Sequence, residues 1–139
     1  MRPRSRVFLS IILAGLSAFN LLGAVDAHRQ ARLLEALPLS VAPGYVWVSA
    51  AVWAVVWAAL AVGVWRGAGR ARRVVVPALG VYLAQGWLNR LAFGRSDYLP
   101  VTAPCAAAAD LALLVLVGVL ARPGAAPEPG RPSPKKEEL

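Results

Sequence analysis

The chain alternates between long apolar segments and short segments that hold most of its arginines, prolines and acidic residues. The apolar segments lie at residues 7–25, 45–65, 74–93 and 105–121. A helix needs about 20 predominantly apolar residues to cross a bilayer, and each segment comes close to that length. We therefore predict an all-α fold, in which residues 1–121 form a polytopic membrane four-helix bundle with four transmembrane helices.

Composition supports this fold class and limits the number of domains. Hydrophobic residues make up 58% of the 139 residues, which is more than a typical soluble domain contains. The length allows one domain. Residues 122–139 are rich in proline and glycine and lack the apolar side chains that a core needs. We expect a disordered cytoplasmic tail there.

The first apolar segment has two interpretations. A secretory signal peptide is one of them, because Val25, Asp26 and Ala27 resemble a small-residue cleavage site. The apolar run is long for a signal peptide, however, and Asn20 interrupts it. We therefore favour a transmembrane helix that is retained in the mature protein.

The connection at residues 26–44 carries a weaker pattern. Three leucines within residues 33–37 fall on one helical face, which indicates a short helix lying in the membrane interface. Pro38 would end this helix, and Pro43–Gly44 would form a turn. In the third segment, Pro77 would fall in the first turn of the helix, where its missing N–H does little harm.

Basic residues divide unevenly between the two sides that four crossings would define. The N-terminus, the middle connection and the tail hold Arg2, Arg4, Arg6, Arg66, Arg70, Arg72, Arg73, Arg122, Arg131, Lys135 and Lys136. The other two connections hold only Arg29, Arg32 and Arg95. Because cytoplasmic segments carry the excess of Lys and Arg, we predict cytoplasmic termini and a multi-pass protein of the bacterial inner (plasma) membrane.

Tryptophans and alanines give the second segment a pattern of its own. Trp47 and Trp65 would lie about 27 Å apart along a helix axis, so that each would anchor one membrane interface. Trp53 and Trp57 are one turn apart; they could stack on a ligand, but we favour the filling of space between helices. A stripe of small residues, where another helix can approach closely, consists of Ala50, Ala54, Ala58 and Ala61.

The two halves of the chain follow the same order of arginines, helix, connection and helix. Residues 20–22 (Asn-Leu-Leu) match residues 89–91 (Asn-Arg-Leu), and Leu-Pro precedes both the second and the fourth segment. This pattern indicates a two-fold repeat of helical hairpins, with an axis along the membrane normal. Chance similarity is the alternative, because matches arise easily in alanine-rich sequence.

A few polar side chains interrupt the apolar segments, and we expect them to meet. This candidate polar cluster consists of Asn20, Gln85, Asn89, Arg90 and Asp110. Counting 1.5 Å per residue from the predicted helix ends puts Arg90 about 5 Å and Asp110 about 8 Å below the outer surface. We therefore predict an Arg90–Asp110 ion pair, because a charge inside a membrane helix needs a partner or a wet cavity.

The polar cluster allows structural and functional interpretations. Polar contacts between helices fix their register, and Arg90 could instead extend toward the outer headgroups. In the functional interpretation, the cluster lines a small outward-facing cavity that binds a headgroup, an anion or a small solute. Proton or ion translocation is a further alternative.

Catalytic, metal and nucleic-acid chemistry have little support in the sequence. The net charge is +8, but the basic residues flank apolar segments and form no dense basic face, so we expect no nucleic-acid partner. Cys105 is the single cysteine and His28 the single histidine, which excludes CxxC and most metal-ligand spacings. We expect no catalytic residues, no metal, no cofactor and no enzymatic activity.

Three short motifs lie between Leu37 and Phe93. They are Leu-Pro followed by Pro-Gly-Tyr before the second segment, Val-Trp-Arg-Gly at residues 64–67, and Trp-Leu-Asn-Arg at residues 87–90. In this layout the chain resembles some uncharacterised small four-helix bacterial membrane proteins. The resemblance implies a four-helix bundle and no activity.

Two hypotheses for the function follow. The first is a non-catalytic accessory or scaffold subunit, or an assembly partner of a membrane complex. The alternative is a small-solute or lipid-binding protein, or a transporter, that uses the candidate polar cluster. In either case the expected partners are the lipid bilayer and either another membrane subunit or a second copy of the chain.

Overall fold

Helices account for nearly all of the part of the chain that can be placed. The computed structural model describes residues 3–35, 43–93 and 99–122, and within these ranges it contains helices and no strands. The helices are α1 (Pro3–Glu35), α2 (Pro43–Trp65), α3 (Gly69–Phe93) and α4 (Leu99–Ala121). The all-α prediction is therefore confirmed for the described residues.

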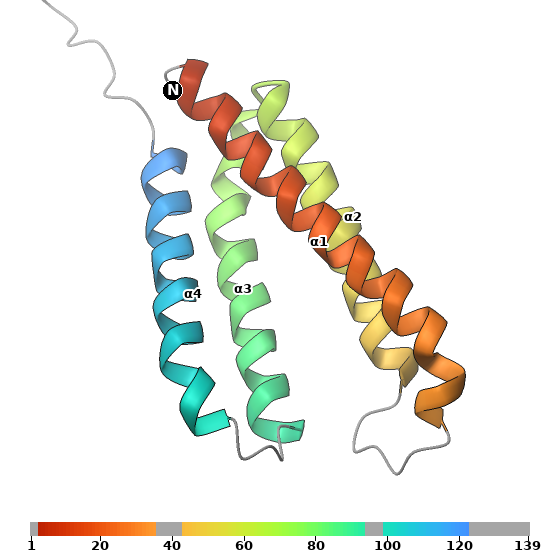
Figure 1. Cartoon of the computed structure of the whole chain (residues 1–139). Coiled ribbons are helices and arrows are strands. Elements are labelled where there is room, and N and C mark those ends of the chain that lie inside the picture. The colour runs from red at the N-terminus through yellow and green to blue at the C-terminus, as the bar shows by residue number, and fades with distance from the viewer. Residues whose placement is uncertain (1–2, 36–42, 94–98, 123–139) are drawn as a thin grey trace, which may run out of the picture.

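Consecutive helices run antiparallel and form two hairpins, α1–α2 and α3–α4 (Figure 1). The start of α1, the α2–α3 turn and the end of α4 lie at one end of the molecule. We call it the arginine end, because its described residues include Arg4, Arg6, Arg66, Arg70, Arg72, Arg73 and Arg122. The other end, where α1 and α3 finish and α2 and α4 begin, is called the distal end. The two hairpins separate toward the distal end.

Three of the helices are long and apolar enough to cross a membrane. The qualifying stretches are Arg4–Gln30 in α1, Gly44–Trp65 in α2 and Val101–Ala121 in α4. They indicate a membrane protein, as the sequence predicted. Helix α3 is not among them, because it begins with arginines and ends with amide side chains and Arg90. Those polar residues lower its hydropathy.

The first helix is longer than the sequence analysis predicted. Instead of ending at Val25 before a separate interfacial helix, α1 continues without a break to Glu35. Nothing between Asp26 and Glu35 stops a helix, because this stretch contains neither proline nor glycine. The side chain of Gln30 donates to Asp26 Oδ2 at 2.8 Å, one turn earlier. The extra turns also bring His28 edge-on to Trp47, with ring centroids 5.5 Å apart.

The prolines of α3 and α4 lie inside the helices, and the predicted helix starts were wrong. Helix α3 begins at Gly69, so Pro77 is in its interior and not in its first turn. Helix α4 begins at Leu99, so Pro104 is also internal. Each proline removes one backbone hydrogen bond. Proline is tolerated inside a membrane helix, because other groups can form a hydrogen bond to the carbonyl that it leaves without a partner.

A glycine turn joins the two hairpins at the arginine end. The N–H of Ala68 donates to the carbonyl of Gly63 (2.9 Å), and the N–H of Gly67 donates to the carbonyl of Val64 (3.0 Å). This pair of hydrogen bonds is a Schellman motif, which ends α2. Gly67 has φ +79°, a left-handed conformation that only glycine adopts at little cost. The sequence from Gly67 to Gly69 thus allows α3 to start at once.

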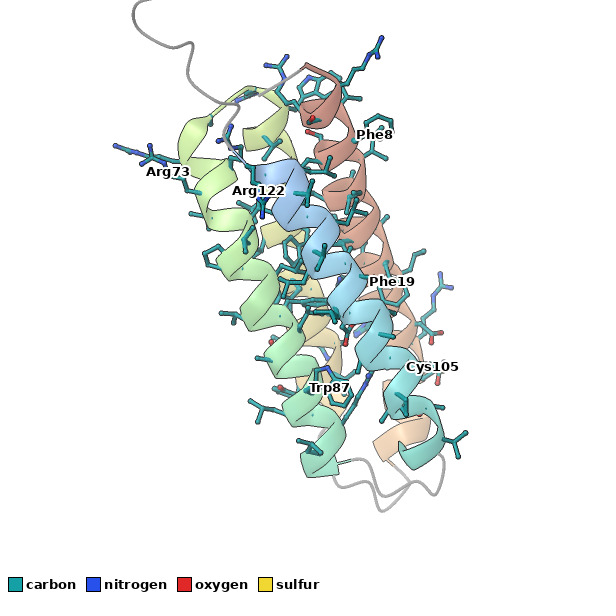
Figure 2. All side chains as sticks on the ribbon, turned by 90° about the vertical axis from the view of Figure 1, so that its left-hand side faces the viewer. Phe8, Phe19, Arg73, Trp87, Cys105 and Arg122 are labelled. Carbon is teal, nitrogen blue, oxygen red and sulfur yellow. The ribbon has the colours of Figure 1, made fainter. Side chains whose placement is uncertain are left out.

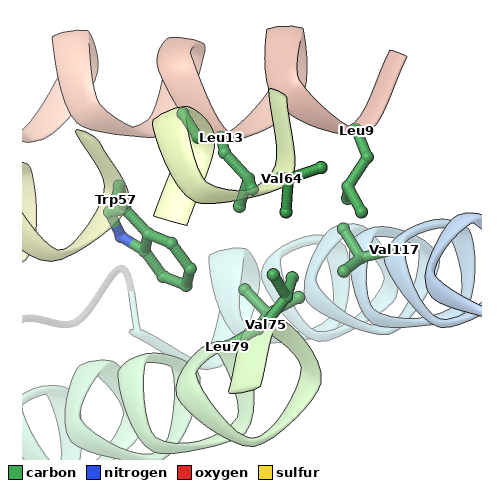
Figure 3. Packing of buried hydrophobic residues seen from close by; sticks show 8 residues of the cluster. Leu9, Leu13, Trp57, Val64, Val75, Leu79 and Val117 are labelled. Atoms are coloured by element: carbon green, nitrogen blue, oxygen red, sulfur yellow. The ribbon is translucent and has the colours of Figure 1, made fainter. Parts of the chain in front are cut away.

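The apolar core occupies the half of the molecule next to the arginine end, and Figure 3 shows how its side chains pack. Residues from all four helices meet there: Leu9, Leu13, Trp57, Ala61, Val64, Val75, Leu79 and Val117. A close approach of α2 and α3 belongs to the same region, since a Cβ on Gly63 would lie 2.7 Å from Ala71 Cβ. Hydrophobic packing therefore fixes the helices to one another at this end.

Three predicted features fall outside the described residues. These are the helix end at Pro38, the connection with Arg95, and residues 123–139 of the predicted disordered tail. They stay predictions. The predicted turn at Pro43–Gly44 was wrong, because α2 begins at Pro43.

Candidate functional site

A cavity of about 420 Å³ lies between the two hairpins, in the half of the molecule toward the distal end. All four helices contribute to its wall. The wall includes every member of the candidate polar cluster, namely Asn20, Gln85, Asn89, Arg90 and Asp110. Its volume is within the range of about 300–1,000 Å³ that is typical of small-molecule sites.

Gln85 connects α3 to α2 through three hydrogen bonds. Its Nε2 donates to the hydroxyls of Ser49 (2.8 Å) and Tyr45 (3.1 Å), and its Oε1 accepts from Trp53 Nε1 (2.6 Å). The Tyr45 hydroxyl in turn donates to Asn89 Oδ1 at 3.0 Å. Both amide donors of Gln85 are therefore used, and a continuous polar ladder closes the α2–α3 side of the cavity.

Asn20 connects α1 to α3 through a side-chain hydrogen bond. Its residue is buried, with 7% of its surface exposed. Its Nδ2 donates to the carbonyl of Leu16 within α1 (2.8 Å) and to the Tyr82 hydroxyl of α3 (3.3 Å). Asn20 therefore reaches the cavity wall, but no hydrogen bond joins it to the other members of the predicted cluster.

The predicted Arg90–Asp110 ion pair is absent, and Trp87 takes its place. Trp87 Nε1 donates to Asp110 Oδ2 at 3.0 Å, while the Arg90 guanidinium carbon lies 5.1 Å from the centroid of the Trp87 ring. Figure 2 shows Trp87 on α3 beside α4. The side chain thus satisfies the carboxylate with its indole N–H and the cation with its ring face.

The start of α4 explains the missing ion pair. Because α4 begins at Leu99 and not at Cys105, Asp110 lies about 16 Å along the helix from its distal end. Arg90 lies about 5 Å from the distal end of α3. The carboxylate is therefore deeper than the guanidinium, and Trp87 lies between these two levels.

Aromatic rings form the inner end of the cavity. Trp53 and Trp57 stack with centroids 5.6 Å apart, and Tyr82 packs edge-on against both rings, at 5.1 Å and 5.6 Å. Trp57 is fully buried, and its Nε1 has no acceptor in the described part of the chain. Its indole nitrogen lies on the side of the ring away from Leu9 and Val117 (Figure 3). Trp57 fills space between helices, whereas Trp53 also lines the cavity.

The small-residue stripe divides between two faces of α2. Ala54 and Ala61 are buried, and the Ser17 hydroxyl of α1 donates to the Ala54 carbonyl at 2.8 Å. Ala50 lines the cavity, and Ala58 is exposed. The stripe is thus a helix contact at only part of its length. The predicted interface anchors Trp47 and Trp65 are the fifth and the last residue of α2.

Sequence reasoning missed four hydrogen-bond partners of the candidate polar cluster. These are Tyr45, Ser49, Tyr82 and Trp87, each of which forms a hydrogen bond to a member of the candidate polar cluster. Polar groups inside a bilayer need partners, and the tyrosines and tryptophans of neighbouring segments are the candidates that the sequence offers. Which of them would pair depends on helix rotation and register, and these are not encoded in hydropathy.

The groups that line the cavity are able to form hydrogen bonds and ion pairs with a small molecule. The cavity offers amide, hydroxyl, carboxylate and guanidinium groups above an aromatic floor. No group of three or more His, Cys, Asp or Glu residues in the described ranges could hold a metal ion.

The fold and the site together define a class, namely a helical membrane protein with a polar cavity between two hairpins. Comparison of the chain with protein families, curated proteins and solved structures found no match. The function is therefore argued from the cavity.

Proposed function

We propose that the protein is a four-crossing inner-membrane protein whose cavity binds a small solute or a lipid. The fourth crossing is α3. Its 25 residues extend about 37 Å, enough for a hydrocarbon core of about 30 Å. It also runs alongside the three apolar helices (Figure 1). Its polar residues line the cavity, where they avoid lipid.

Both termini are assigned to the cytoplasm in this proposal. The support is the concentration of arginines at the arginine end, whereas Arg29 and Arg90 are the arginines with described side chains toward the distal end. Segments rich in arginine stay on the cytoplasmic side. The cavity then belongs to the half of the protein that faces the exterior.

One observation carries the binding function: the five polar residues picked out by sequence line a single cavity to which all four helices contribute. Polar and charged side chains are costly within a bilayer and commonly mark functional sites. A protein that needed polar contacts only to fix helix register could pair them without leaving a space. Here the same residues surround a volume that fits a small molecule.

Gly86 offers a direct test, because it lines the cavity and a Cβ placed on it would meet no atom within 4 Å. Gly86→Leu would therefore add a side chain at the cavity wall whose Cβ has open space around it. Gly80→Leu is the matched control, since Gly80 lies on the same helix, has equally open surroundings, and is not part of the cavity wall.

We expect the wild type and Gly80→Leu to retain a bound small molecule or lipid when they are extracted in mild detergent. Gly86→Leu should lose it. Native mass spectrometry of the three proteins measures the mass that remains bound. An empty wild type, or a Gly86→Leu protein with unchanged occupancy, would contradict the binding function.

A second candidate function is that of an accessory subunit or scaffold. The observation in its favour is the exposure of α4, where Val117 is the one buried residue among those whose side chains are described. Such a helix offers a long apolar face to a partner subunit, although lipid would cover it equally well. Co-purification of a partner with the tagged protein would support this function, and recovery as a single chain under all mild conditions would oppose it.

A further inference from the structure

We infer that the cavity recognises a zwitterion, namely a molecule that carries an ammonium group and a phosphate or carboxylate a few bonds apart. This inference rests on the proposed binding function and specifies its ligand class. The chemistry is that of a phosphoethanolamine headgroup. The basis is a pair of opposite charges that line one cavity without forming a salt bridge.

Arg90 and Asp110 are both in the cavity wall. Opposite charges in a membrane protein usually pair with each other, because the desolvation cost of each is otherwise unmet. Here the Trp87 side chain holds them apart, since it binds Asp110 through Nε1 and lies under the Arg90 guanidinium. Both charges consequently keep hydrogen-bonding capacity that can face a ligand.

The hydrogen-bonding capacity that remains on Asp110 and on Arg90 defines what each side chain would bind. A carboxylate has two oxygens and accepts several hydrogen bonds, and Trp87 is the one donor to Asp110 among the described residues. An ammonium group supplies three donors and a compensating charge. A guanidinium presents a planar array of donors that matches phosphate or carboxylate oxygens. Arg90 makes its ring contact with Trp87 and remains exposed.

Depth gives the ligand an orientation. Arg90 is exposed and close to the distal end, whereas Asp110 is half-buried and further inside. The anionic group would therefore bind at the mouth and the ammonium group inside. Trp53, which lines the cavity, adds aromatic surface that favours a cation. The Asn89 Nδ2 group is available to the rest of the headgroup, since among the described residues only Oδ1 of this side chain is used, by Tyr45.

A lipid headgroup and a free zwitterion share this chemistry. The apolar edge of the cavity suits the lipid, because Phe19 and Val46 line the wall and are 72% and 45% exposed. Figure 2 shows Phe19 on α1 at the side next to α4. Acyl chains could lie against this edge while the headgroup occupies the cavity.

The test uses the full chain in detergent and native mass spectrometry with four added probes. Three are lipids with the same acyl chains: phosphatidylethanolamine, phosphatidylglycerol and phosphatidylcholine. The fourth is free O-phosphoethanolamine. We expect phosphatidylethanolamine to bind about tenfold more tightly than phosphatidylglycerol, which corresponds to one ion-pair contact of about 1.4 kcal/mol. Phosphatidylcholine should also bind more weakly, because its trimethylammonium group donates no hydrogen bond.

Three variants distinguish the contributions of the two charges to binding from effects on folding. Asp110→Asn keeps an acceptor for Trp87 and should abolish the preference for phosphatidylethanolamine over phosphatidylglycerol. Arg90→Gln should weaken both lipids by a similar factor. Arg70→Gln, on the same helix at the arginine end, should change neither. Thermal unfolding of each variant shows whether a loss of binding reflects a loss of fold.

The outcomes distinguish this inference from the proposed function. Displacement of bound lipid by O-phosphoethanolamine would support a zwitterionic ligand that is a free solute. Binding of phosphatidylethanolamine but not of O-phosphoethanolamine would support a zwitterionic lipid headgroup as the ligand. If phosphatidylglycerol bound as tightly as phosphatidylethanolamine, and Asp110→Asn changed neither affinity, the inference of a zwitterionic ligand would be overturned. The proposed binding function of the cavity would still stand. If no probe bound and Gly86→Leu changed nothing, the proposed function itself would fail.

Discussion

At the scale of single residues, Gln85 forms the most side-chain hydrogen bonds of the five residues in the candidate polar cluster. It makes three hydrogen bonds to side chains of α2, whereas Asn89 accepts one. A side-chain hydrogen bond between membrane helices contributes about 0.6 kcal/mol on average. The contribution of Gln85 is therefore predicted to be a multiple of that of Asn89.

Replacement of these two amides tests this difference. Gln85→Leu should lower the free energy of unfolding by roughly 2 kcal/mol, and Asn89→Leu by about 0.6 kcal/mol. Reversible unfolding in mixed micelles measures both values. Equal losses in the two variants would show that the ladder does not hold α2 to α3 through Gln85.

Trp87 shows how much of a site depends on a residue that the sequence analysis did not include in the candidate polar cluster. Its indole N–H and ring face serve Asp110 and Arg90 together. The sequence indicated that these two charges would share a layer, and the structure brings both to one cavity. Their direct pairing failed because a shift of six residues in the start of α4 moved Asp110 inward by about 9 Å.

At the scale of helices, the turn between α2 and α3 depends on one backbone conformation. Gly67 has φ +79°, and any other residue pays about 1–2 kcal/mol to adopt a left-handed conformation. A Cβ there would also lie 3.3 Å from a terminal nitrogen of Arg6, which is the flexible end of a side chain and can move. Strain in the backbone therefore dominates.

Gly67→Ala should accordingly destabilise the protein by about 1–2 kcal/mol. Gly69→Ala is the control, because Gly69 begins α3, has no positive φ, and has no neighbour within 4 Å of a Cβ. Its effect should stay within about 0.5 kcal/mol. Unfolding midpoints of the two variants measured under the same conditions make the comparison. Similar destabilisation by both substitutions would contradict the role of the Schellman motif.

Hydropathy predicted where the helices are but not where they end. The apolar segments correspond to α1–α4 because twenty apolar residues are a strong and local signal. The ends were misplaced where polar residues continue a helix, as in Asp26–Glu35, or where proline is tolerated within one, as at Pro77 and Pro104. Hydropathy measures transfer into lipid and does not report whether the helical backbone continues beyond it.

At the scale of the whole molecule, the two ends differ in how their side chains pack. Near the arginine end, Leu9, Leu13, Leu79 and Val117 pack into one apolar core with Trp57 (Figure 3). Toward the distal end the hairpins separate, and polar side chains surround a cavity. The sequence could predict which polar residues belong there, because they stand out against apolar segments. It could not predict their partners, because pairing depends on how four helices rotate against one another.

This division leaves a packed core in one half of the molecule and an open cavity in the other. A ligand that entered the cavity would contact all four helices while the core stayed packed. Bound ligand should therefore raise the thermal stability of the protein, since a molecule that binds only the folded state stabilises it by mass action. Gly86→Leu should lose this increase and Gly80→Leu should keep it, as measured by unfolding with and without added lipid.

The central claim is that a hydrated cavity opens to the exterior between membrane-spanning helices. Ala50 and Ala51 are neighbours at the same depth of α2, but only Ala50 is part of the cavity wall. In a Cys105→Ser background, Ala50→Cys and Ala51→Cys would each place one thiol in the protein. A thiol reacts as the thiolate, which requires water. The measurement is the rate of reaction with a small membrane-impermeant thiol reagent added outside intact cells. The account predicts rapid labelling of Ala50→Cys and little labelling of Ala51→Cys. Equal rates at the two positions, or labelling of Ala50→Cys only after the cells are opened, would contradict it.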